Sequence, residues 1–348
     1  MEKGKLKVLH LLESDRFSGA ENVVCQIFEM LRDWDYEMAY SSMDGQIREA
    51  LAKRGIPFRP MKKLTLKEAH RVVQAYKPDI IHAHDMRASV IASIVGGRAK
   101  VISHMHGNNS KMRKLNARTL AYLACSSRFG RIIWVSRSSF ESYRFTRQIS
   151  RKSAVLYNTL NPKQVMEKAG RGPAEAYDVV FLGRMSYPKN PEKLLRVLRL
   201  AADKNPCMRA AVIGDGELFE STRCLAKEMG LADNVTFLGF LENPMAILKN
   251  AKVMVMTSRY EGTPMCALEA MILGVPIVST PVDGLADLVE DCENGFLAEA
   301  DEELADCIGI LIMDGEKRRR MSVAAQKKAE AYIRISEYRD QIIKFYSI

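Results

Sequence analysis

The stretch Arg259-Tyr-Glu-Gly-Thr-Pro-Met-Cys-Ala-Leu-Glu269, continued by Ala270-Met-Ile-Leu-Gly-Val-Pro-Ile-Val-Ser279, decides the fold of this chain. The apolar run just before it, Val253-Met-Val-Met256, predicts a buried parallel strand. The Gly-Thr-Pro triplet then supplies a turn and the start of a helix, which we expect to run from about Pro264 to Leu273 and to stop at Gly274. A strand, a tight turn and an apolar helix in this order are typical of a parallel α/β sheet.

Two carboxylates, Glu261 and Glu269, flank this turn and helix. Glu269 is the one charge in an otherwise apolar helix, which predicts that the helix is packed on all sides. Burial of an unpaired charge costs roughly several kcal/mol, so Glu269 needs a partner. Two kinds of partner remain open: a basic side chain in a structural ion pair, or a ligand hydroxyl.

The first amides of the predicted helix point out of its start, where the helix dipole favours negative charge. These amides belong to Thr263, Met265, Cys266 and Ala267. A phosphate fits such a place, and carboxylates beside a phosphate have hydroxyl groups as their natural partners. A phosphate between two groups that carry hydroxyls, a ribose and a transferred sugar, describes a nucleotide sugar.

Further motifs follow the predicted strand ends along nearly the whole chain. In order, they are Ser18-Gly-Ala-Glu21, His82-Ala-His-Asp85, Ser103-His-Met-His-Gly107, Trp134-Val-Ser136, Phe181-Leu-Gly-Arg184, Lys189-Asn-Pro191, Val212-Ile-Gly-Asp-Gly216 and Val235-Thr-Phe-Leu-Gly239. With Glu261-x7-Glu269, this ordered set resembles the retaining glycosyltransferases of family 4, in the glycosyl transferases group 1, of the polysaccharide-biosynthesis type. The resemblance implies the GT-B fold, an α/β fold of two Rossmann-like parallel-sheet domains that face a cleft.

The resemblance also implies roles for residues in the second half of the chain. Arg184 and Lys189 hold the diphosphate of the donor and stabilise negative charge as the sugar leaves, in place of a metal ion. Glu261 orients the sugar hydroxyls and Glu269 the ribose. The other donor-binding residues implied are Gly19, Gly183, Gly239, Phe240, Gly262, Thr263, Pro264, Met265, Cys266 and Ala267.

No cofactor and no metal ion are expected, because the chain lacks a convincing Asp-x-Asp motif. The alternative, that Arg184 and Lys189 are surface charges after a strand, stays open. Two positions depart from the family pattern, since Ala20 replaces a glycine of the first loop and Val282-Asp-Gly-Leu285 replaces a double glycine.

Four of the six histidines lie at two neighbouring strand ends, as His82 with His84 and as His104 with His106. Adjacent parallel strands can present such side chains together, so a metal site has to be weighed. No thiolate pattern supports one. The resemblance implies instead that His106 contacts the transferred sugar as a catalytic residue, with Glu261, Arg184 and Lys189, and that His84 and Asp85 shape the acceptor side.

Strand-then-helix units repeat through both halves of the chain and predict twelve strands. We expect an acceptor-side domain over residues 1–160 and a nucleotide-sugar domain over 161–329, joined near Asn158-Thr-Leu-Asn-Pro162. A long charged helix is predicted from about Glu316 to Tyr346. By resemblance, its last part, about residues 330–348, packs back on the first domain.

The net charge of +10 is concentrated between Arg98 and Lys152, a segment that contains thirteen basic residues and only one acidic residue, Glu141. Such a surface attracts anionic lipids, polyphosphates or nucleic acids. Lys111-Met-Arg-Lys-Leu115 and Leu120-Ala-Tyr-Leu-Ala124 alternate basic and apolar residues as an interfacial helix does, although an ordinary solvated helix stays open. Seven scattered cysteines and the lack of a membrane-spanning run predict a cytoplasmic protein, peripheral at the inner face of a membrane.

The function predicted from these features is retaining transfer of a hexose or N-acetylhexosamine from a UDP-sugar to a lipid-linked or polysaccharide acceptor. In the mechanism that the resemblance implies, the acceptor hydroxyl attacks from the face that the nucleotide leaves, and the leaving phosphate oxygen takes the proton. Two other classes stay open. A UDP-sugar epimerase shares the fold, and a basic nucleic-acid-binding protein fits the charge but lacks a helix-turn-helix and interleaved aromatic residues.

Overall fold

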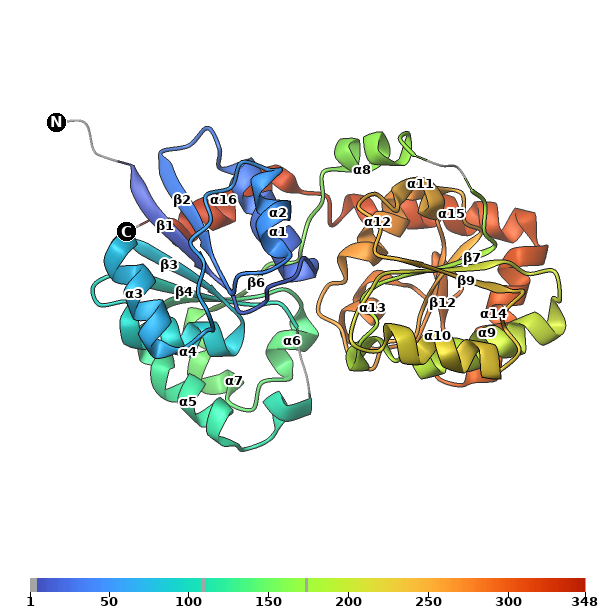
Figure 1. Cartoon of the computed structure of the whole chain (residues 1–348), viewed down its shortest axis with the longest axis horizontal. Coiled ribbons are helices and arrows are strands. Elements are labelled where there is room, and N and C mark those ends of the chain that lie inside the picture. Colours follow the sequence, from blue (N-terminus) through green and yellow to red (C-terminus); the bar gives the residue numbers. More distant parts are fainter. Residues whose placement is uncertain (1–4, 108–109, 173–174, 348) are drawn as a thin grey trace. The chain divides into compact units, whose positions relative to one another are not determined.

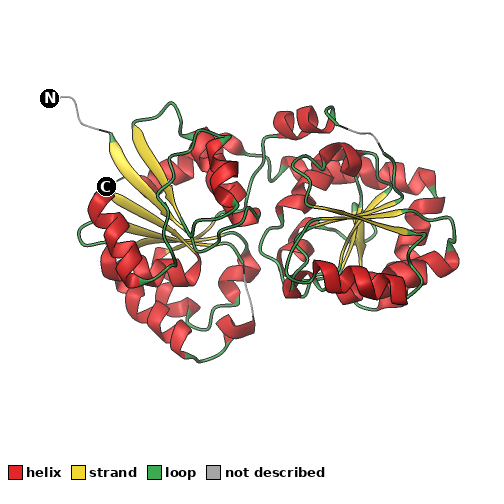
Figure 2. Cartoon of the chain, viewed as in Figure 1, coloured by secondary structure: helices red, strands yellow, loops and turns green. Residues whose placement is uncertain are grey.

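The computed structural model describes residues 5–107, 110–172 and 175–347, which divide into two compact units. One unit holds the chain up to Asn158 together with the segment from Ile335 onward, and the other holds Thr159–Arg334. Each unit contains one six-stranded parallel sheet with helices on both faces (Figure 2). The sequence therefore correctly predicts an α/β protein with two parallel sheets.

The sheet of the first unit has the strand order β2-β1-β3-β4-β5-β6. Its strands are β1 (Leu6–Leu11), β2 (Tyr36–Ser41), β3 (Ile80–His84), β4 (Lys100–Met105), β5 (Phe129–Trp134) and β6 (Ser153–Val155). Its helices are α1 (Gly19–Met30), α2 (Ile47–Ala52), α3 (Leu66–Tyr76), α4 (Asp85–Val95), α5 (Ala117–Cys125), α6 (Arg137–Glu141), α7 (Thr146–Ile149) and α16 (Ile335–Tyr346), with short 3-10 turns at Ser110–Arg113, Ser126–Arg128 and Ser150–Lys152.

The central strands of this sheet are buried on both faces, which is why they are almost continuously apolar. Helices α3, α4 and α5 cover one face, while α1, α2 and α16 lie on the other (Figure 1). The exceptions to the apolar pattern are serines and histidines at the carboxyl ends of β1, β3 and β4. Polar side chains at that edge of a doubly wound sheet mark the usual position of a ligand site.

The sheet of the second unit has the order β12-β11-β10-β7-β8-β9. Its strands are β7 (Val179–Leu182), β8 (Ala210–Ile213), β9 (Val235–Gly239), β10 (Val253–Met256), β11 (Ile277–Ser279) and β12 (Gly295–Leu297). Its helices are α8 (Pro162–Ala169), α9 (Pro191–Lys204), α10 (Phe219–Glu228), α11 (Met245–Lys249), α12 (Met265–Leu273), α13 (Asp283–Leu288), α14 (Asp301–Met313) and α15 (Gly315–Glu330), with a 3-10 turn at Tyr187–Lys189. All twelve predicted strands are present, with ends that differ by at most two residues.

Helix α12 forms as its sequence predicts. Pro264 is the residue before the helix, and Gly274 ends it with a φ of 72°, a left-handed conformation that glycine adopts without strain. Seven of its nine residues are buried, and it packs against α8, α11 and α15. Because the helix is apolar almost all round, its position relative to strand β10 is fixed by packing.

The prediction of one helix from about Glu316 to Tyr346 is wrong. The structure contains two helices, α15 and α16, separated by residues 331–334. Tyr332 anchors the break, because its hydroxyl donates a hydrogen bond of 3.0 Å to the carbonyl oxygen of Asp287 in the second unit. Helix α16 belongs to the first unit, so the break is where the chain passes from one unit to the other.

None of the helices in the described ranges is both long and apolar enough to cross a membrane.

Candidate active site

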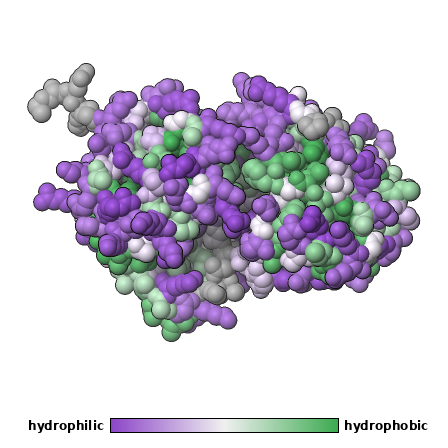
Figure 3. Space-filling view, viewed as in Figure 1, coloured by the Kyte–Doolittle hydropathy of each residue, from purple (hydrophilic) through white to green (hydrophobic). Residues whose placement is uncertain are grey.

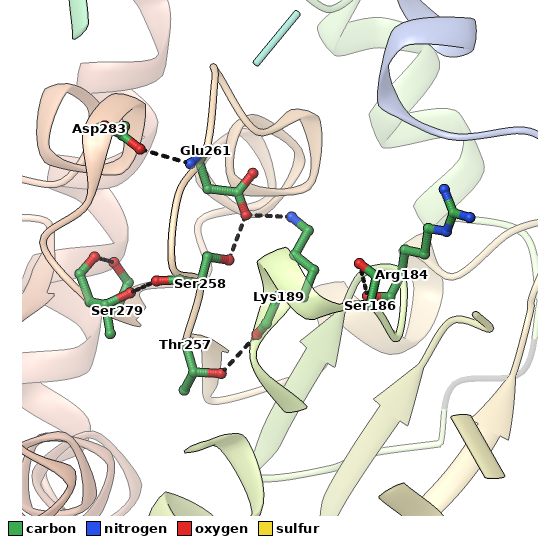
Figure 4. Close-up of polar contacts among 9 residues, drawn as sticks. Arg184, Ser186, Lys189, Thr257, Ser258, Glu261, Ser279 and Asp283 are labelled. Atoms are coloured by element: carbon green, nitrogen blue, oxygen red, sulfur yellow. Dashed lines mark hydrogen bonds and ion pairs between the residues drawn. The ribbon is translucent and has the colours of Figure 1, made fainter. Parts of the chain in front are cut away.

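A buried ion pair between Lys189 and Glu261 lies at the carboxyl edge of the second sheet. The Lys189 ammonium is 2.5 Å from the Glu261 carboxylate, and the Ser258 hydroxyl donates to the same oxygen at 2.5 Å (Figure 4). The Lys189 and Glu261 side chains are only 17% and 10% exposed. Burial alone lowers the pKa of Lys189, but the Glu261 carboxylate outweighs it and the net pKa is raised. The lysine is therefore a permanent cation at this edge.

The turn that carries Glu261 is held by the loop after β11. The carboxylate of Asp283 accepts a hydrogen bond of 3.1 Å from the Glu261 backbone amide. Asp283 has a φ of 43°, which is rare for a residue with a side chain. A Cβ atom on Gly284 would lie 1.5 Å from the carbonyl oxygen of Gly262, so only glycine fits there. Asp283 stands where the family pattern has a glycine, and its side chain fixes the turn that presents Glu261.

Arg184 is in a different environment from Lys189. Its side chain is 45% exposed and lies 3.6 Å from the carboxylate of Glu217. Figure 4 shows it directed away from the pair of Lys189 and Glu261. The resemblance implies that both cations hold one diphosphate, and the structure presents one largely buried, paired cation and one exposed cation beside Glu217.

Of the predicted free amides at the start of α12, two are free and one is not. Within the described part of the chain, the amides of Met265 and Cys266 have no hydrogen-bond partner, which leaves them available to an anion. The Ala267 amide was expected to be free as well, and this is wrong. It donates 3.1 Å to the carbonyl oxygen of Pro264, because the first turn of the helix is tightened. Thr263, at the turn before the helix, is buried.

Glu269 lies on α12 among apolar neighbours and is partly buried. Burial raises the pKa of its carboxyl group to about 7, and Lys168 of α8 acts in the opposite direction. The described residues include no ion pair to Glu269 within 4 Å. Of the two partners that the sequence left open, the structural ion pair is therefore not formed, and the carboxyl group remains available to a ligand.

The glycines after β7, β8 and β9 have different roles. Gly214 has a φ of 130°, and a Cβ atom there would lie 2.0 Å from the carbonyl oxygen of Gly183, so the contact between the two loops requires it. Gly183 itself is next to the Lys189 side chain. Gly239 has a φ of 65°, and Phe240 after it is 64% exposed. An exposed aromatic ring at a strand end offers a face on which a nucleobase can stack.

The first loop of the first unit places a glycine at the start of α1. Gly19 is exposed, and the neighbouring Glu21 is buried and accepts a hydrogen bond from the Ser18 hydroxyl. Burial raises the pKa of Glu21, with hydrogen bonds from Ser18 opposing it. Glu21 thus caps its own helix from inside, while Gly19 leaves backbone open to a ligand.

Five of the six histidines form one cluster in the first unit. It contains His10 of β1, His82 and His84 of β3, His104 of β4, and the partly buried His106 directly after β4. Burial lowers the pKa of all five, to about 3 for His10 and His106, so the rings are neutral at pH 7. From the sequence, the four histidines at the ends of β3 and β4 are expected to lie together. His10 has the same alternating place on β1 but was not recognised.

Asp85 orients the last residue of this cluster. Its carboxylate accepts a hydrogen bond of 3.0 Å from the His106 backbone amide, and its own φ is 68°. Asp85 is exposed, and the hydrogen bond from the His106 amide favours its charged form. His84, Asp85 and His106 are therefore in direct contact, as expected for a site at the ends of β3 and β4.

The same cluster offers nitrogen atoms to a metal ion. His10, His82 and His84 each place one nitrogen within 4.8 Å of the others, and so do His84, His104 and His106. The donor set has the chemistry of a zinc site. The nitrogens are, however, already paired with one another at 2.7 to 3.1 Å.

Two family models match the chain. The model of glycosyl transferases group 1 matches residues 163–328, and the model of Glycosyltransferase Family 4 matches residues 17–164. The first therefore includes Lys189, Glu261 and Glu269, and the second includes the histidine cluster apart from His10.

Named relatives agree with these matches. The O-antigen biosynthesis glycosyltransferase WbnH of Escherichia coli is 24% identical over 331 residues, which is 91% of this chain and 94% of the relative. The GalNAc-alpha-(1->4)-GalNAc-alpha-(1->3)-diNAcBac-PP-undecaprenol alpha-1,4-N-acetyl-D-galactosaminyltransferase of Campylobacter jejuni is 31% identical over 48% of this chain. The chain spans about half the length of that relative and of a further curated glycosyltransferase that it matches.

A solved structure has the same fold. The structure of Anabaena Alr3699/HepE in complex with UDP and glucose superposes with a TM-score of 0.83 at 23% identity and covers 97% of this chain and 98% of its own. The two six-stranded sheets thus correspond to the GT-B fold.

Proposed function

We propose, from the premise that the chain belongs to the group 1 glycosyltransferases of family 4, that it transfers a sugar from a UDP-sugar to a lipid-linked or polysaccharide acceptor in cell-surface glycan synthesis. The observation that carries the proposal is the buried pair of Lys189 and Glu261 beside the free amides of α12. UDP and glucose in the Anabaena neighbour and the O-antigen role in the Escherichia coli relative's name support this choice of donor and product.

Lys189 is suited to hold the donor diphosphate. It is a largely buried cation whose present partner is a carboxylate, and a diphosphate carries more negative charge than a carboxylate. The Met265 and Cys266 amides add donors at the positive end of a helix dipole. We assign the exposed Arg184 to the same anion, in place of its pair with Glu217. These cations and amides supply the charge stabilisation that a divalent ion supplies in other transferases.

When Lys189 turns to the diphosphate, Glu261 is released to bind hydroxyl groups of the sugar. Ser258 and the Asp283 contact to its amide keep it in place during this exchange. Glu269 accepts hydrogen bonds from the ribose, and the exposed ring of Phe240 stacks on the base. We assign these residues, with Gly183, Gly239, Gly262, Thr263 and Pro264, to the donor site, and Gly19 to a backbone contact with the donor.

The proposed chemistry is retaining. The acceptor hydroxyl attacks the anomeric carbon from the face that the nucleotide leaves, the bond from that carbon to the phosphate oxygen breaks, and this oxygen takes the acceptor's proton. No enzyme nucleophile is needed. We assign His106 to the transferred sugar, a hexose or N-acetylhexosamine, and His84 and Asp85 to the acceptor side.

A basic and apolar surface in the first unit is suited to an anionic membrane. Leu115 and Leu120 are 63% and 47% exposed, beside the exposed cations Arg113, Lys114 and Arg118. Green residues gather among purple ones at the lower edge of that unit, where Figure 1 places α5 (Figure 3). The surface consists of a 3-10 turn and helix α5, with an Asn116 cap between them, and not of one interfacial helix. The Lys111 side chain lies outside the described residues.

This basic and apolar surface indicates where in the cell the protein works. Cations beside exposed leucines bind acidic headgroups while the leucines enter the interface. We propose that the protein works from the cytoplasm at the inner face of the membrane, where a polyprenyl-linked acceptor is found. The undecaprenol in the name of the Campylobacter relative supports this acceptor class.

Thermal-shift measurements with a panel of nucleotide sugars test the function, because a ligand that binds only the folded state raises its stability. We expect a UDP-sugar to raise the melting temperature of the wild type. Lys189→Met should abolish the rise. Lys204→Met, which removes a cation of an exposed surface pair with Asp306, should leave it unchanged.

Product analysis then separates the classes. Incubation with the stabilising UDP-sugar and a polyprenyl-phosphate-linked acceptor should yield a longer acceptor with the α configuration of the donor. Interconversion of UDP-sugars without an acceptor would identify an epimerase instead. Binding of duplex DNA with no response to any nucleotide sugar would contradict both enzymatic functions.

A further inference from the structure

Five histidines, four of them buried and His106 partly buried, form a single chain of hydrogen bonds with one tyrosine. From one end, His106 Nε2 pairs with His84 Nδ1 at 2.7 Å, and His84 Nε2 pairs with His10 Nδ1 at 3.1 Å. His10 Nε2 then lies 3.3 Å from the hydroxyl of Tyr346 on helix α16. The hydroxyl continues to His82 Nδ1 at 2.8 Å, and His82 Nε2 ends the chain at His104 Nδ1, 3.1 Å away.

The two terminal nitrogens of this chain are buried and have no partner in the described structure. They are His106 Nδ1 and His104 Nε2. Every other imidazole nitrogen of the five rings is used in a link of the chain. The network is therefore closed to further hydrogen bonds except at its two ends and at the Tyr346 oxygen, which can also keep its own proton outside the chain.

Proton counting limits this network to three arrangements. Each neutral imidazole carries one N–H and the phenol one O–H, which gives six protons for five links. Because each link needs one proton, a single proton is left over. It resides on His106 Nδ1, on His104 Nε2, or on a Tyr346 hydroxyl that accepts from both neighbours.

The direction of the Tyr346 O–H bond selects among these arrangements. If it points to His10, every link on that side runs toward His106, whose Nδ1 then carries the spare proton and is a donor. If it points to His82, the links reverse, His106 Nδ1 is bare, and it is an acceptor. The third arrangement also leaves His106 Nδ1 bare.

A metal ion does not explain this geometry as well. Two ligands of one tetrahedral zinc ion, each about 2.0–2.1 Å from it, lie roughly 3.3 Å apart. His84 and His106 are closer, at 2.7 Å, which is the spacing of a hydrogen bond. Burial also keeps all five rings neutral, as the chain requires.

We propose that Tyr346 is a positioning residue, through which the C-terminal helix α16 determines which nitrogen of His106 carries its proton. His106 thereby presents one fixed donor or acceptor at Nδ1. The consequence for sugar transfer rests on the proposed function, in which His106 contacts the transferred sugar. The control of the tautomer does not rest on it.

NMR of protein labelled with 15N in its histidines tests the proposal, because the nitrogen shifts distinguish the two neutral tautomers. His70, exposed on α3 and outside the hydrogen-bonded chain, is an internal reference. In the wild type we expect each of the five rings of the chain to be one neutral tautomer, unchanged between pH 6 and 8. Tyr346→Phe removes the central link, so His84 and His106 should become mixtures of tautomers or reverse.

Tyr338→Phe is the matched control. Tyr338 is on the same helix and 3% exposed, but its hydroxyl has no hydrogen-bond partner in the described structure. Its removal should leave all five tautomers as in the wild type. Unchanged His84 and His106 signals in Tyr346→Phe, or mixed tautomers already in the wild type, would overturn the proposal.

Kinetics connect the tautomer to the reaction. Tyr346→Phe should lower kcat for sugar transfer by about fivefold, which is the typical value of one neutral hydrogen bond, with UDP affinity unchanged. Tyr338→Phe should keep the wild-type kcat. A change of tautomer in Tyr346→Phe without any change in kcat would show that Tyr346 has no role in the reaction. Absence of transfer by the wild type would contradict the proposed function, and the NMR result would still decide the proposal about the tautomers.

Discussion

Replacement of Glu269 by glutamine should make the free protein more stable and the donor site weaker. The carboxyl group lies partly buried on an apolar helix, and burial raises its pKa to about 7 from an ordinary 4.5. Glutamine has the same shape and hydrogen-bonding reach but no charge to desolvate. The variant therefore separates the cost of the buried charge from the packing of the side chain.

The size of the effect follows from the two pKa values. The gap between 4.5 and about 7, at 1.36 kcal/mol per pH unit, corresponds to about 3 kcal/mol. Because the pKa is raised in the folded state, the wild type has its full stability below pH 4.5 and loses it as the pH rises through 7. Glu269→Gln should thus be more stable than the wild type by about 3 kcal/mol at pH 8.5 and nearly equal to it at pH 4.5.

Thermal unfolding at the two pH values measures this difference. For a unit of this size, about 3 kcal/mol corresponds to a shift of roughly 6 to 12 °C at pH 8.5. UDP-sugar binding should change in the opposite direction, with at least several-fold loss in the variant. In the wild type, affinity should fall about tenfold from pH 8 to pH 6, because fewer molecules carry the carboxylate that accepts from the ribose.

Two results would refute this reasoning. Equal melting temperatures of variant and wild type at pH 8.5 would mean that the charge is not desolvated. An unchanged affinity for UDP-sugars would remove Glu269 from the donor site. Lys168→Met is the companion variant, since loss of the opposing charge should raise the pKa of Glu269 further and move the fall in affinity to higher pH.

Further changes test the loop and the membrane surface. Gly284→Ala should lower the melting temperature by more than 10 °C or prevent folding, because its Cβ would overlap the carbonyl oxygen of Gly262; a variant with wild-type stability would contradict the contact. Lys114→Glu with Arg118→Glu should reduce binding to vesicles of anionic lipid in a flotation assay, without effect on neutral vesicles. Equal binding of the double variant and the wild type would exclude this surface as the membrane contact.

The sequence predicts the parts of the fold that depend on local patterns. Strand β10 is a short apolar run bounded by turn residues, β3 is a short buried strand that carries two histidines, and both form as expected. Helix α12 ends at Gly274 because glycine takes the left-handed conformation there. The sequence also places Lys189 and Glu261 after strands of the second sheet, but their pairing required the strand order of the structure, in which β7 and β10 are neighbours.

Other features depend on contacts between distant segments, which one sequence does not contain. The hydroxyl of Tyr346 reaches the histidines only because α16 returns to the first sheet. Helix periodicity continues past residue 330 with no signal for the break. In the sequence, Asp283 is noticeable only because the family pattern has a glycine at its position. Its hydrogen bond with the Glu261 amide could not be predicted and is known only from the structure.

In the free protein, Glu261 is paired with Lys189, the cation that we assign to the donor diphosphate. In the free protein its carboxylate is 2.5 Å from the Lys189 ammonium, so a diphosphate has to displace it. Glu261→Gln keeps the contact with Ser258 but removes the competing charge. UDP, which has no sugar for Glu261 to hold, should therefore bind about tenfold more tightly to the variant.

A complete donor should respond differently. Transfer from a UDP-sugar should fall by at least tenfold in Glu261→Gln, because the variant holds the sugar hydroxyls without a charge-assisted hydrogen bond. Glu217→Gln, which removes the carboxylate near the exposed Arg184, should change UDP affinity little, since solvent screens that pair. Calorimetry with UDP on the three proteins tests the competition. Weaker UDP binding by Glu261→Gln would show that the carboxylate positions Lys189 for the diphosphate and does not compete with it.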